Sequence, residues 1–419
     1  MKGGMLDAVN IDRYNQYMNQ PLYLSAREAV AELGIQPATL YAYVSRGLIR
    51  SVPGPGKQKR YDASDIRKLL VQRDRPEPQG GARPLSGDPV LETRLTHIGE
   101  DGPWYRGHRA TDLAKSLTLE ATAALLWDCE EDPFAGTVSM QLPLFPDGMG
   151  AVERLMTALA AWPVSDPSAY TRSPQLLLRK GAAFVRVAAA ALLGRAEVSS
   201  LPVHEQLAEC WLVPGRSGAG GISAADGADL IRAALVLSAD HELNTSAFTV
   251  RCAASTRAPL HAALIAGAGA FTGPRHGAAS DRVGLWFDQI HSAADAEAVL
   301  HERLMLGEPL HGFGHSVYRS KDPRGDMLLD MLKAKKGGCP AAELAATVST
   351  LARDLFGLEP NIDFAFAVLR RALGLPPQAG KTIFCAGRMV GWVAHALEQY
   401  ATPEQIRPRA IYTGERPRK

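Results

Sequence analysis

The sequence has few cysteines and no long uninterrupted apolar run, and each shortage excludes a class of protein. Its five cysteines are scattered and form no CxxC pair, which argues against a disulfide framework or a zinc ribbon and predicts a reducing compartment. The most apolar segment, residues 182–193, is interrupted by Arg186 and is too short to cross a bilayer. The first 16 residues contain no apolar core, so we expect no secretory signal. These features predict a cytoplasmic protein without a membrane partner.

The net charge is also small. The 46 lysine and arginine residues exceed the 44 aspartate and glutamate residues by only two, so the overall charge indicates no class of partner. Hydrophobic residues (46%) and charged residues (21%) occur in ordinary globular proportions, which excludes disordered and collagen-like chains. The length of 419 residues predicts two or three domains.

Runs that alternate Val, Ile or Thr with polar residues are scarce, and aromatic residues make up only 7% of the chain. Alanine-rich stretches recur instead, and alanine forms helices at the lowest cost, so we expect a mainly α fold. Residues 75–89 contain four prolines and three glycines with almost nothing apolar, which is typical of a linker. The sequence thus predicts a tail over residues 1–20, a small domain over 21–74, this linker, and a block over 90–419.

The small domain has the start and stop signals of two short helices. Ser25 and Glu28 have the spacing of a capping box, and Gly34 ends the helix that they open. Pro37 opens a second helix, which Gly47 ends. The apolar residues of these helices that we expect to face inward are Ala29, Val30, Leu33, Leu40, Tyr41 and Val44.

A hairpin follows the two helices. The segment GLIRSVPGPGKQKRYD predicts a strand, a Pro/Gly turn and a second strand, and Asp62 or Ser64 is placed to cap a third helix. Two short helices joined by a tight turn and followed by such a wing form a helix-turn-helix pattern. Between Arg27 and Arg75 there are ten basic and five acidic residues, an excess of five positive charges suited to neutralising phosphates.

The stretches TLYAYVSRGLI and KQKRYDASDI resemble the winged helix-turn-helix of MerR and excisionase-type proteins. This resemblance implies DNA binding by the second helix and the wing. The candidate DNA-binding residues are Thr39, Tyr41, Ala42, Arg46, Lys57, Lys59 and Arg60. The alternative is that the same fold is a protein-contact or dimerisation module whose basic face is only solvated.

Polar residues gather in a few clusters of the C-terminal block. The clusters are HELNTSAF from His241, GPRHGAAS from Gly273, GFGHSVYRSKDPRGD from Gly312, PNIDFAF from Pro360 and FCAGRMVGWVAHALEQ from Phe384. In two of them, His276 and His315 lie in glycine-flanked loops, where the backbone can approach a ligand closely.

Helix-end geometry predicts where the charged residues of these clusters lie. Asp322, which is followed by proline, fits a helix N-cap, so Arg324 falls in the first turn of that helix. Asn361 is placed to cap another helix, with Asp363 in its first turn near the free N–H groups. Arg388 lies in an otherwise apolar helix, where an unpaired charge is costly, so we expect a buried anionic partner for it.

Together these clusters resemble the citrate synthase family. The motifs HELN, GPxHG, GFGHxVY followed by DPR, PNxD and GRxxGW occur in family order, and the resemblance extends from WYRGHRATDLAKSLTLEATAALLW to the final IRPRAIYTG. It implies an all-helical fold of two lobes, in which a small lobe over residues 280–374 closes over the substrates. The large lobe would comprise residues 90–279 and 375–419.

The activity that this resemblance implies is that of an acyltransferase. Acetyl-CoA and oxaloacetate would condense and, with water, give citrate and CoA, without a cofactor or a metal. The carboxylate of Asp363 would remove a proton from the acetyl methyl group, and His276 would hydrogen bond to the thioester oxygen. His315 would polarise the oxaloacetate carbonyl and protonate the new alkoxide. The residues implied in substrate binding are His241, Arg324, Arg388 and Arg407, the last supplied across the interface of a homodimer.

Two alternatives remain open. A 2-methylcitrate synthase would use propionyl-CoA, and one methylene changes binding by only ~1–3 kcal/mol, so the sequence does not decide between them. A DNA-binding transcription regulator would use the block to sense a metabolite. The chain departs from the family pattern at Arg275, Ser280, Asp281 and Ser316, which leaves the accepted acyl-CoA open. We interpret Trp392, His311 and His395 as core or surface residues without a role in the chemistry.

Overall fold

The structure is a computed structural model. It describes residues 23–56, 58–63, 65–66, 69, 91–138, 140–212, 221–318, 320–335, 339–408, 410 and 413–415. The predicted tail, the predicted linker and Lys57 lie outside the described residues. The described residues form two compact units, the first from residues 23–69, 290–310 and 347–359, and the second from nearly all of the others.

The N-terminal segment of the first unit contains the elements of the winged helix-turn-helix. In chain order they are β1 (Tyr23–Ser25), α2 (Ala26–Leu33), α3 (Pro37–Ser45), β2 (Ser51–Pro53) and β3 (Lys59–Asp62). The predicted capping box is confirmed, because Ser25 accepts from the backbone N–H of Glu28, whose carboxylate accepts from the N–H of Ser25. The strands form an antiparallel sheet in the order β1-β3-β2, so the predicted hairpin is present and β1 extends it.

The core of this segment is formed by Ala29, Leu33, Leu40, Ile49, Tyr61 and Ile66. The expectation that Tyr41 faces inward is wrong, since 58% of its surface is exposed. Leu40 and Val44 are four residues apart and share a helix face, whereas Tyr41 is turned about 100° away from Leu40. Its exposure leaves the Tyr41 ring available to a partner.

The second unit begins with a small antiparallel sheet of β4 (Thr96–Gly99), β5 (Gly102–Tyr105) and β6 (His108–Arg109). Helices follow it, which confirms the expected mainly α fold. They are α5 (Ala110–Leu113), α6 (Leu119–Trp127), α7 (Ala151–Ser165), α8 (Pro174–Leu193), α9 (Val203–Trp211), α10 (Ala224–Ser238), α11 (Thr245–Ser255), α12 (Leu260–Phe271), α13 (Ala279–Phe287), α15 (Pro323–Lys333), α17 (Ile362–Leu373) and α18 (Ala379–Tyr400). Two further helices carry residues of the first unit, α14 (Ala293–Leu306) and, in its last turns, α16 (Pro340–Phe356).

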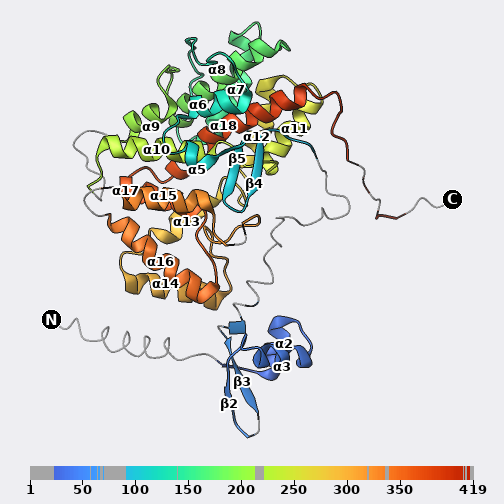
Figure 1. Cartoon of the computed structure of the whole chain (residues 1–419), viewed down its shortest axis with the longest axis vertical. Helices are drawn as coiled ribbons and strands as arrows, with labels where there is room; N and C mark the ends of the chain where they lie inside the picture. The colour runs from blue at the N-terminus through green and yellow to red at the C-terminus, as the bar shows by residue number, and fades with distance from the viewer. Residues whose placement is uncertain are drawn as a thin grey trace. The chain divides into compact units, whose positions relative to one another are not determined.

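Helix α18 is the central element of the second unit. It packs against α6, α8, α10, α11 and α12, which surround it in Figure 1. Glycines allow its backbone to approach α10 closely: a Cβ atom on Gly387 would lie 2.6 Å from the carbonyl oxygen of Leu235. Beyond α10, the N–H of Gly391 donates to the carbonyl of Ala239 at 3.0 Å. The middle of α18 is therefore fixed against the C-terminal end of α10.

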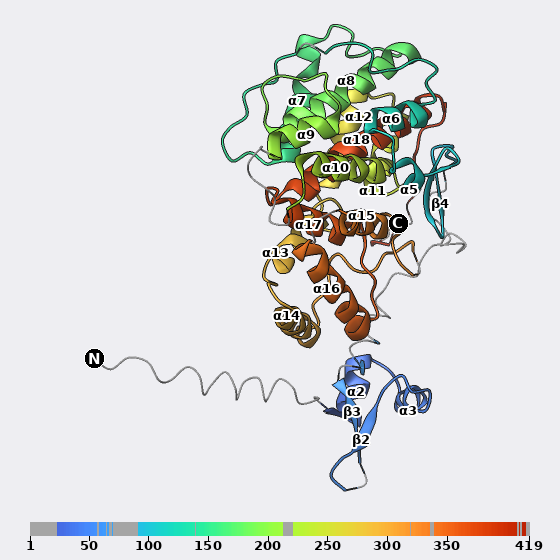
Figure 2. The same ribbon diagram turned by 60° about the vertical axis from the view of Figure 1, so that its left-hand side comes forward.

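Helices α15 and α17 pack side by side, as Figure 1 and Figure 2 both show, and α13 packs against α17. A Cβ atom on Gly325 in α15 would lie 2.8 Å from the backbone of Asn361, which explains a glycine at that position. Rings of α13 and α17 form the core between these helices, with Trp286 and Phe364 stacked at a centroid distance of 6.0 Å. The N-terminal ends of α15 and α17 are consequently neighbours.

Within the described ranges, no helix is both long enough and apolar enough to span a membrane. The same residues contain no cluster of three or more His, Cys, Asp or Glu side chains arranged to hold a metal ion.

Candidate active site

All seven predicted catalytic and substrate-binding residues belong to the second unit, and five of them lie near helix ends. His241 follows α10, His276 lies in the turn before α13, His315 precedes α15, Arg324 and Asp363 lie in the first turns of α15 and α17, and Arg388 lies within α18. The predicted caps of α15 and α17 are confirmed: Asp322 accepts from the N–H of Arg324, and Asn361 from that of Asp363.

His241 and His315 contact each other, with ring centroids 5.3 Å apart. His241 is buried, and its Nε2 lies 2.9 Å from the hydroxyl of Tyr318. Burial, and then the positive charge of Arg324, lowers the pKa of His241 well below its usual value. The imidazole is therefore neutral at physiological pH.

His315 is held in one tautomer. Its Nδ1 accepts a hydrogen bond from the backbone N–H of Val317 at 3.0 Å, so the proton of the neutral ring is on Nε2. Burial and the neighbouring Arg324 lower its pKa to about 4, which keeps the ring neutral at pH 7. Nε2 lies 3.5 Å from Nη2 of Arg324. This arrangement makes His315 a neutral hydrogen-bond donor beside a cation.

His276 is also neutral, since burial lowers its pKa to about 4 and the charge of Arg388 adds to the effect. Its Nε2 lies 2.7 Å from the hydroxyl of Ser246, which accepts from Trp392 Nε1 at 3.0 Å and donates to the amide oxygen of Asn244 at 2.8 Å. A serine hydroxyl has a single proton. While Ser246 donates this proton to Asn244, His276 donates to Ser246 from Nε2. When the hydroxyl turns to His276 instead, the ring proton moves to Nδ1, which is then free to donate to a ligand.

Arg324 is a buried cation with a buried partner. Its Nε and Nη2 donate to the two carboxylate oxygens of Asp322 at 3.0 and 2.8 Å, and both side chains are almost fully buried. Burial disfavours both charges, but their attraction outweighs it, so the pKa of Asp322 is lowered and that of Arg324 is raised. The pair is therefore inaccessible to water.

Arg388 is buried without a carboxylate partner in the described part of the chain. It is 1% exposed, Nε donates to the carbonyl of Ser238 at 2.9 Å, and Nη2 has no hydrogen-bond acceptor. Burial lowers its pKa to about 10. The expected anionic partner is thus absent from these protein residues. A buried guanidinium with a free N–H group is suited to bind the carboxylate of a ligand.

Asp363 has the properties of a general base. It lies in the first turn of α17, and its Oδ1 accepts a hydrogen bond from Ser280 at 2.5 Å. Burial raises its pKa to about 6, although Ser280 and Arg324 act in the opposite direction. A carboxylate with a pKa near neutrality is ionised at pH 7 and still binds a proton readily.

Asn361 connects the residues of α17 with the loop that carries His315. Its side-chain oxygen caps α17, and its Nδ2 donates to the carbonyl of Gly314 at 2.8 Å. Its backbone N–H donates to the carbonyl of Gly312 at 2.9 Å. One residue next to the site thus fixes the spacing between Asp363 and His315.

We expect Asn361→Ala to lower the free energy of unfolding by about 0.5–2 kcal/mol, because α17 loses its cap. It should also lower turnover, because the His315 loop loses its attachment. Ser292→Ala is the matched control, since Ser292 caps α14, which belongs to the first unit. Chemical denaturation and turnover should separate the two variants: equal losses of turnover would contradict a positioning role for Asn361.

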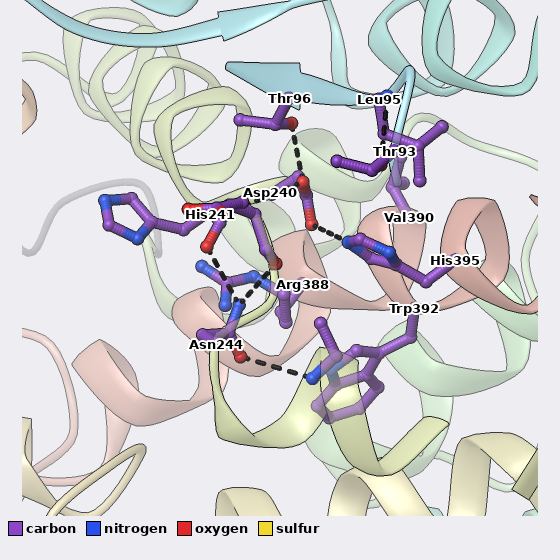
Figure 3. A network of polar contacts seen from close by, with 12 residues as sticks. Thr93, Leu95, Thr96, Asp240, His241, Asn244, Arg388, Val390, Trp392 and His395 are labelled. Carbon is purple, nitrogen blue, oxygen red and sulfur yellow. Dashed lines mark hydrogen bonds and ion pairs between the residues drawn. The ribbon is translucent and has the colours of Figure 1, made fainter. Parts of the chain in front are cut away.

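A buried network holds the segment that carries His241. The carboxylate of Asp240 accepts from Thr96 of β4 at 2.5 Å and lies 3.2 Å from Nε2 of His395 in α18. Figure 3 shows this carboxylate between the two partners, with the imidazole of His241 pointing away from it. Burial alone would raise the pKa of Asp240, but His395 and Arg388 outweigh burial and lower it. His395 is therefore a fully buried residue that fixes the chain beside His241.

Sequence reasoning missed several contributors to this site. Ser246, Tyr318 and Asp240 lie in or next to the motifs, but their partners are 30, 77 and 155 residues away. No local pattern indicates such contacts. Arg407 lies in the segment after α18 and is exposed.

The fold and these side chains define a mainly helical scaffold with neutral histidines, a basic carboxylate and buried arginines at helix ends. The family model "Citrate synthase, C-terminal domain" matches residues 84–409, and the model "Helix-turn-helix domain" matches residues 23–74. The chain belongs to the citrate synthase family and carries an additional N-terminal helix-turn-helix domain.

Individual relatives agree with this assignment. The citrate synthase of Haloferax volcanii is 30% identical over 369 residues, which cover 80% of this chain and 96% of that protein. The 2-methylcitrate synthase of Shewanella oneidensis is 35% identical over 188 residues, which cover 44% of this chain and 50% of that protein. For four other curated relatives the chain likewise spans about half of their length, 50% to 52%.

The fold is also that of a solved citrate synthase. The enzyme of Thermoplasma acidophilum, solved as a ternary complex with carboxymethyl coenzyme A and oxaloacetate, superposes with a TM-score of 0.64 at 24% sequence identity. The superposition covers 80% of this chain and 96% of that structure.

Proposed function

We propose that this protein is a citrate synthase, which condenses acetyl-CoA with oxaloacetate and water to give citrate and CoA. The observation that carries the proposal is the combination, within one compact unit, of a carboxylate with a raised pKa, neutral histidines and a buried arginine lacking an acidic partner. The ternary complex of the Thermoplasma acidophilum enzyme supports it, since that protein of the same fold binds oxaloacetate and a CoA derivative.

In the first step, Asp363 removes a proton from the methyl group of acetyl-CoA. This carbon acid is very weak, so the negative charge that develops on the thioester oxygen needs a donor. His276 provides it through Nδ1–H once the hydroxyl proton of Ser246 turns from Asn244 to Nε2 of His276. A neutral histidine is suited to this role, since it stabilises the enol without transferring its proton completely.

In the second step, the enol carbon forms a bond to the carbonyl carbon of oxaloacetate. His315 donates from Nε2 to the carbonyl oxygen and protonates the alkoxide that forms. Water then hydrolyses the thioester of citryl-CoA, which releases CoA and returns both side chains to their initial protonation states. No cofactor or metal takes part in this scheme.

The two carboxylates of oxaloacetate require fixed cations. We assign Arg388 to one of them, because its Nη2 has no protein acceptor in the described residues. Arg324 and His241 complete the site, and Arg407 of a second subunit closes it in a homodimer. Oxaloacetate would therefore bind beside the His241 and His315 pair.

We further propose that residues 280–374 form a small lobe that closes over residues 90–279 and 375–419. Closure would bring Asp363 of the small lobe toward His276 at its edge and would exclude water until condensation is complete.

A cytoplasmic location fits the five cysteines, which are all free thiols.

Release of CoA thiol in the presence of oxaloacetate tests the proposal. We expect oxaloacetate-dependent release from acetyl-CoA, and its absence with both acetyl-CoA and propionyl-CoA would overturn the assignment.

The relative from Shewanella oneidensis makes 2-methylcitrate synthase the second candidate. A higher kcat/KM for propionyl-CoA than for acetyl-CoA would favour it.

The N-terminal domain supports a further candidate function, which is DNA binding. In its second helix and just beyond it, Tyr41 and Arg46 are exposed and Thr39 is partly exposed. Lys59 and Arg60 of the wing are exposed too, but they are consecutive in β3, so their side chains point to opposite faces of the sheet. Arg50 is occupied by Asp65 and Asp62 and is not assigned to DNA.

We predict that Arg46→Ala weakens binding of the full chain to its own upstream DNA. The slope of log K against log salt should fall in magnitude by about 0.9, because one fewer phosphate is neutralised by the protein. Arg27→Ala is the control: it removes an equal charge from an exposed position of α2 and should leave the slope unchanged. Gel-shift titration at several salt concentrations measures the slope for both variants.

The same gel-shift assay separates the alternatives. Dependence of DNA binding on oxaloacetate or acetyl-CoA would favour the transcription regulator, and absence of any DNA binding would favour a protein-contact module.

A further inference from the structure

The carboxylate of Asp363 has a single side-chain donor among the described residues. Ser280 Oγ donates to Asp363 Oδ1 at 2.5 Å, and Ser280 is only 5% exposed. Asp363 Oδ2 receives no hydrogen bond from these residues. A carboxylate held through one oxygen keeps the other oxygen for the proton that it is to accept.

The hydroxyl of Ser280 is committed to this contact. Ser280 lies in the first turn of α13, where a serine often bonds to a backbone carbonyl of the preceding turn. Here its proton goes instead to a side chain 83 residues away. The hydrogen bond therefore connects two helices, α13 and α17, and does not connect two turns of one helix.

This hydrogen bond also joins Asp363 to the segment that follows His276. The turn before α13 is closed by the N–H of His276, which donates to the carbonyl of Gly273, and by the N–H of Ala279, which donates to the carbonyl of His276. Ser280 follows directly on this closed turn. Its bond to Asp363 thus ties α17 to the helix that begins at the His276 turn.

We propose that Ser280 is a positioning residue for Asp363, which orients the carboxylate and holds it in register with His276. The proposal rests on the proposed function of Asp363 as the base. Charges of both signs face the carboxylate of Asp363, and the hydroxyl of Ser280 favours its ionised form. Arg324 of α15 acts in the same direction, whereas Asp322 before α15 and Asp281 of α13, itself 3.7 Å from Lys381 of α18, act against it.

Ser280→Ala removes the donor at almost constant volume. We expect kcat for CoA release to fall by about 10- to 100-fold, as for loss of a hydrogen bond to a charged group, with KM for oxaloacetate within about twofold of wild type. The acid limb of the pH profile of kcat/KM should move to higher pH, because the ionised form of Asp363 loses its donor. Exchange of the acetyl-CoA methyl protons with deuterated solvent should slow by a similar factor.

Two further variants separate positioning from packing. Ser280→Thr keeps a hydroxyl and should restore the acid limb, while Ser255→Ala removes a similarly buried hydroxyl in α11 and should change neither the limb nor kcat. A fall in kcat for Ser280→Ala with an unmoved acid limb would overturn the proposal. Wild-type protein without activity, or unchanged turnover in Asp363→Ala, would instead overturn the proposed function itself.

Discussion

Replacing Asp363 with asparagine is expected to reduce CoA release by about 10²–10⁴-fold and, at the same time, to stabilise the folded protein. Asparagine keeps the acceptor for Ser280 but cannot remove a proton from carbon. It also removes a charge that the fold disfavours, since burial raises the pKa of Asp363 to about 6 from 3.8. Activity and stability therefore change in opposite directions at this residue.

The sign of the stability effect follows from proton linkage. The folded state binds a proton to Asp363 more tightly than the unfolded state does, so the wild-type protein loses stability as pH rises from about 4 to about 6. Above pH 6 the loss is complete, and we expect Asp363→Asn to be more stable by about 1–3 kcal/mol. Below pH 4 the two proteins should be equally stable.

Urea denaturation at pH 4 and pH 7.5, together with the CoA release assay, measures both effects. Asp330→Asn is the matched control, because its carboxylate is exposed on α15 and its replacement should leave turnover unchanged. An inactive variant that is less stable at pH 7.5 would assign Asp363 a structural role. A fully active variant would exclude it as the base.

Local features of the site were predictable from sequence because they depend on neighbouring residues. The caps of α15 and α17 follow from Asp322 before proline and from Asn361 two residues before Asp363. Such hydrogen bonds close within one turn, so a short segment contains all of the information. The mainly helical fold follows in the same way from the abundance of alanine.

Long-range partners were not predictable, because each depends on how two helices pack. The contacts of Ser246 with His276 and of Ser280 with Asp363 join residues that no sequence pattern relates. Tyr41 shows the same limit on a smaller scale, since an apolar ring within a helix does not reveal which face the core will cover. The exposed ring is instead the feature of α3 that suggests a partner.

The two buried arginines should respond to different extents to the same substitution. Arg324→Met leaves Asp322 buried without its cation, which we expect to cost about 3–5 kcal/mol of unfolding free energy. Arg388→Met removes a cation that forms no ion pair among the described residues but favours the buried charge of Asp240, so we expect a smaller cost than for Arg324→Met. The difference lies in what each guanidinium already binds.

Oxaloacetate binding should weaken when Arg388 is replaced. We expect KM for oxaloacetate to rise by about 10- to 150-fold in Arg388→Met, as for loss of hydrogen bonds to a carboxylate. Thermal melting with and without oxaloacetate separates the two effects, because a ligand that binds only the folded state raises the melting temperature. Without the ligand, Arg388→Met should melt closer to wild type than Arg324→Met does, and it should lose most of the increase that oxaloacetate causes. Full retention of that increase would mean that the free N–H of Arg388 is not where the substrate carboxylate binds.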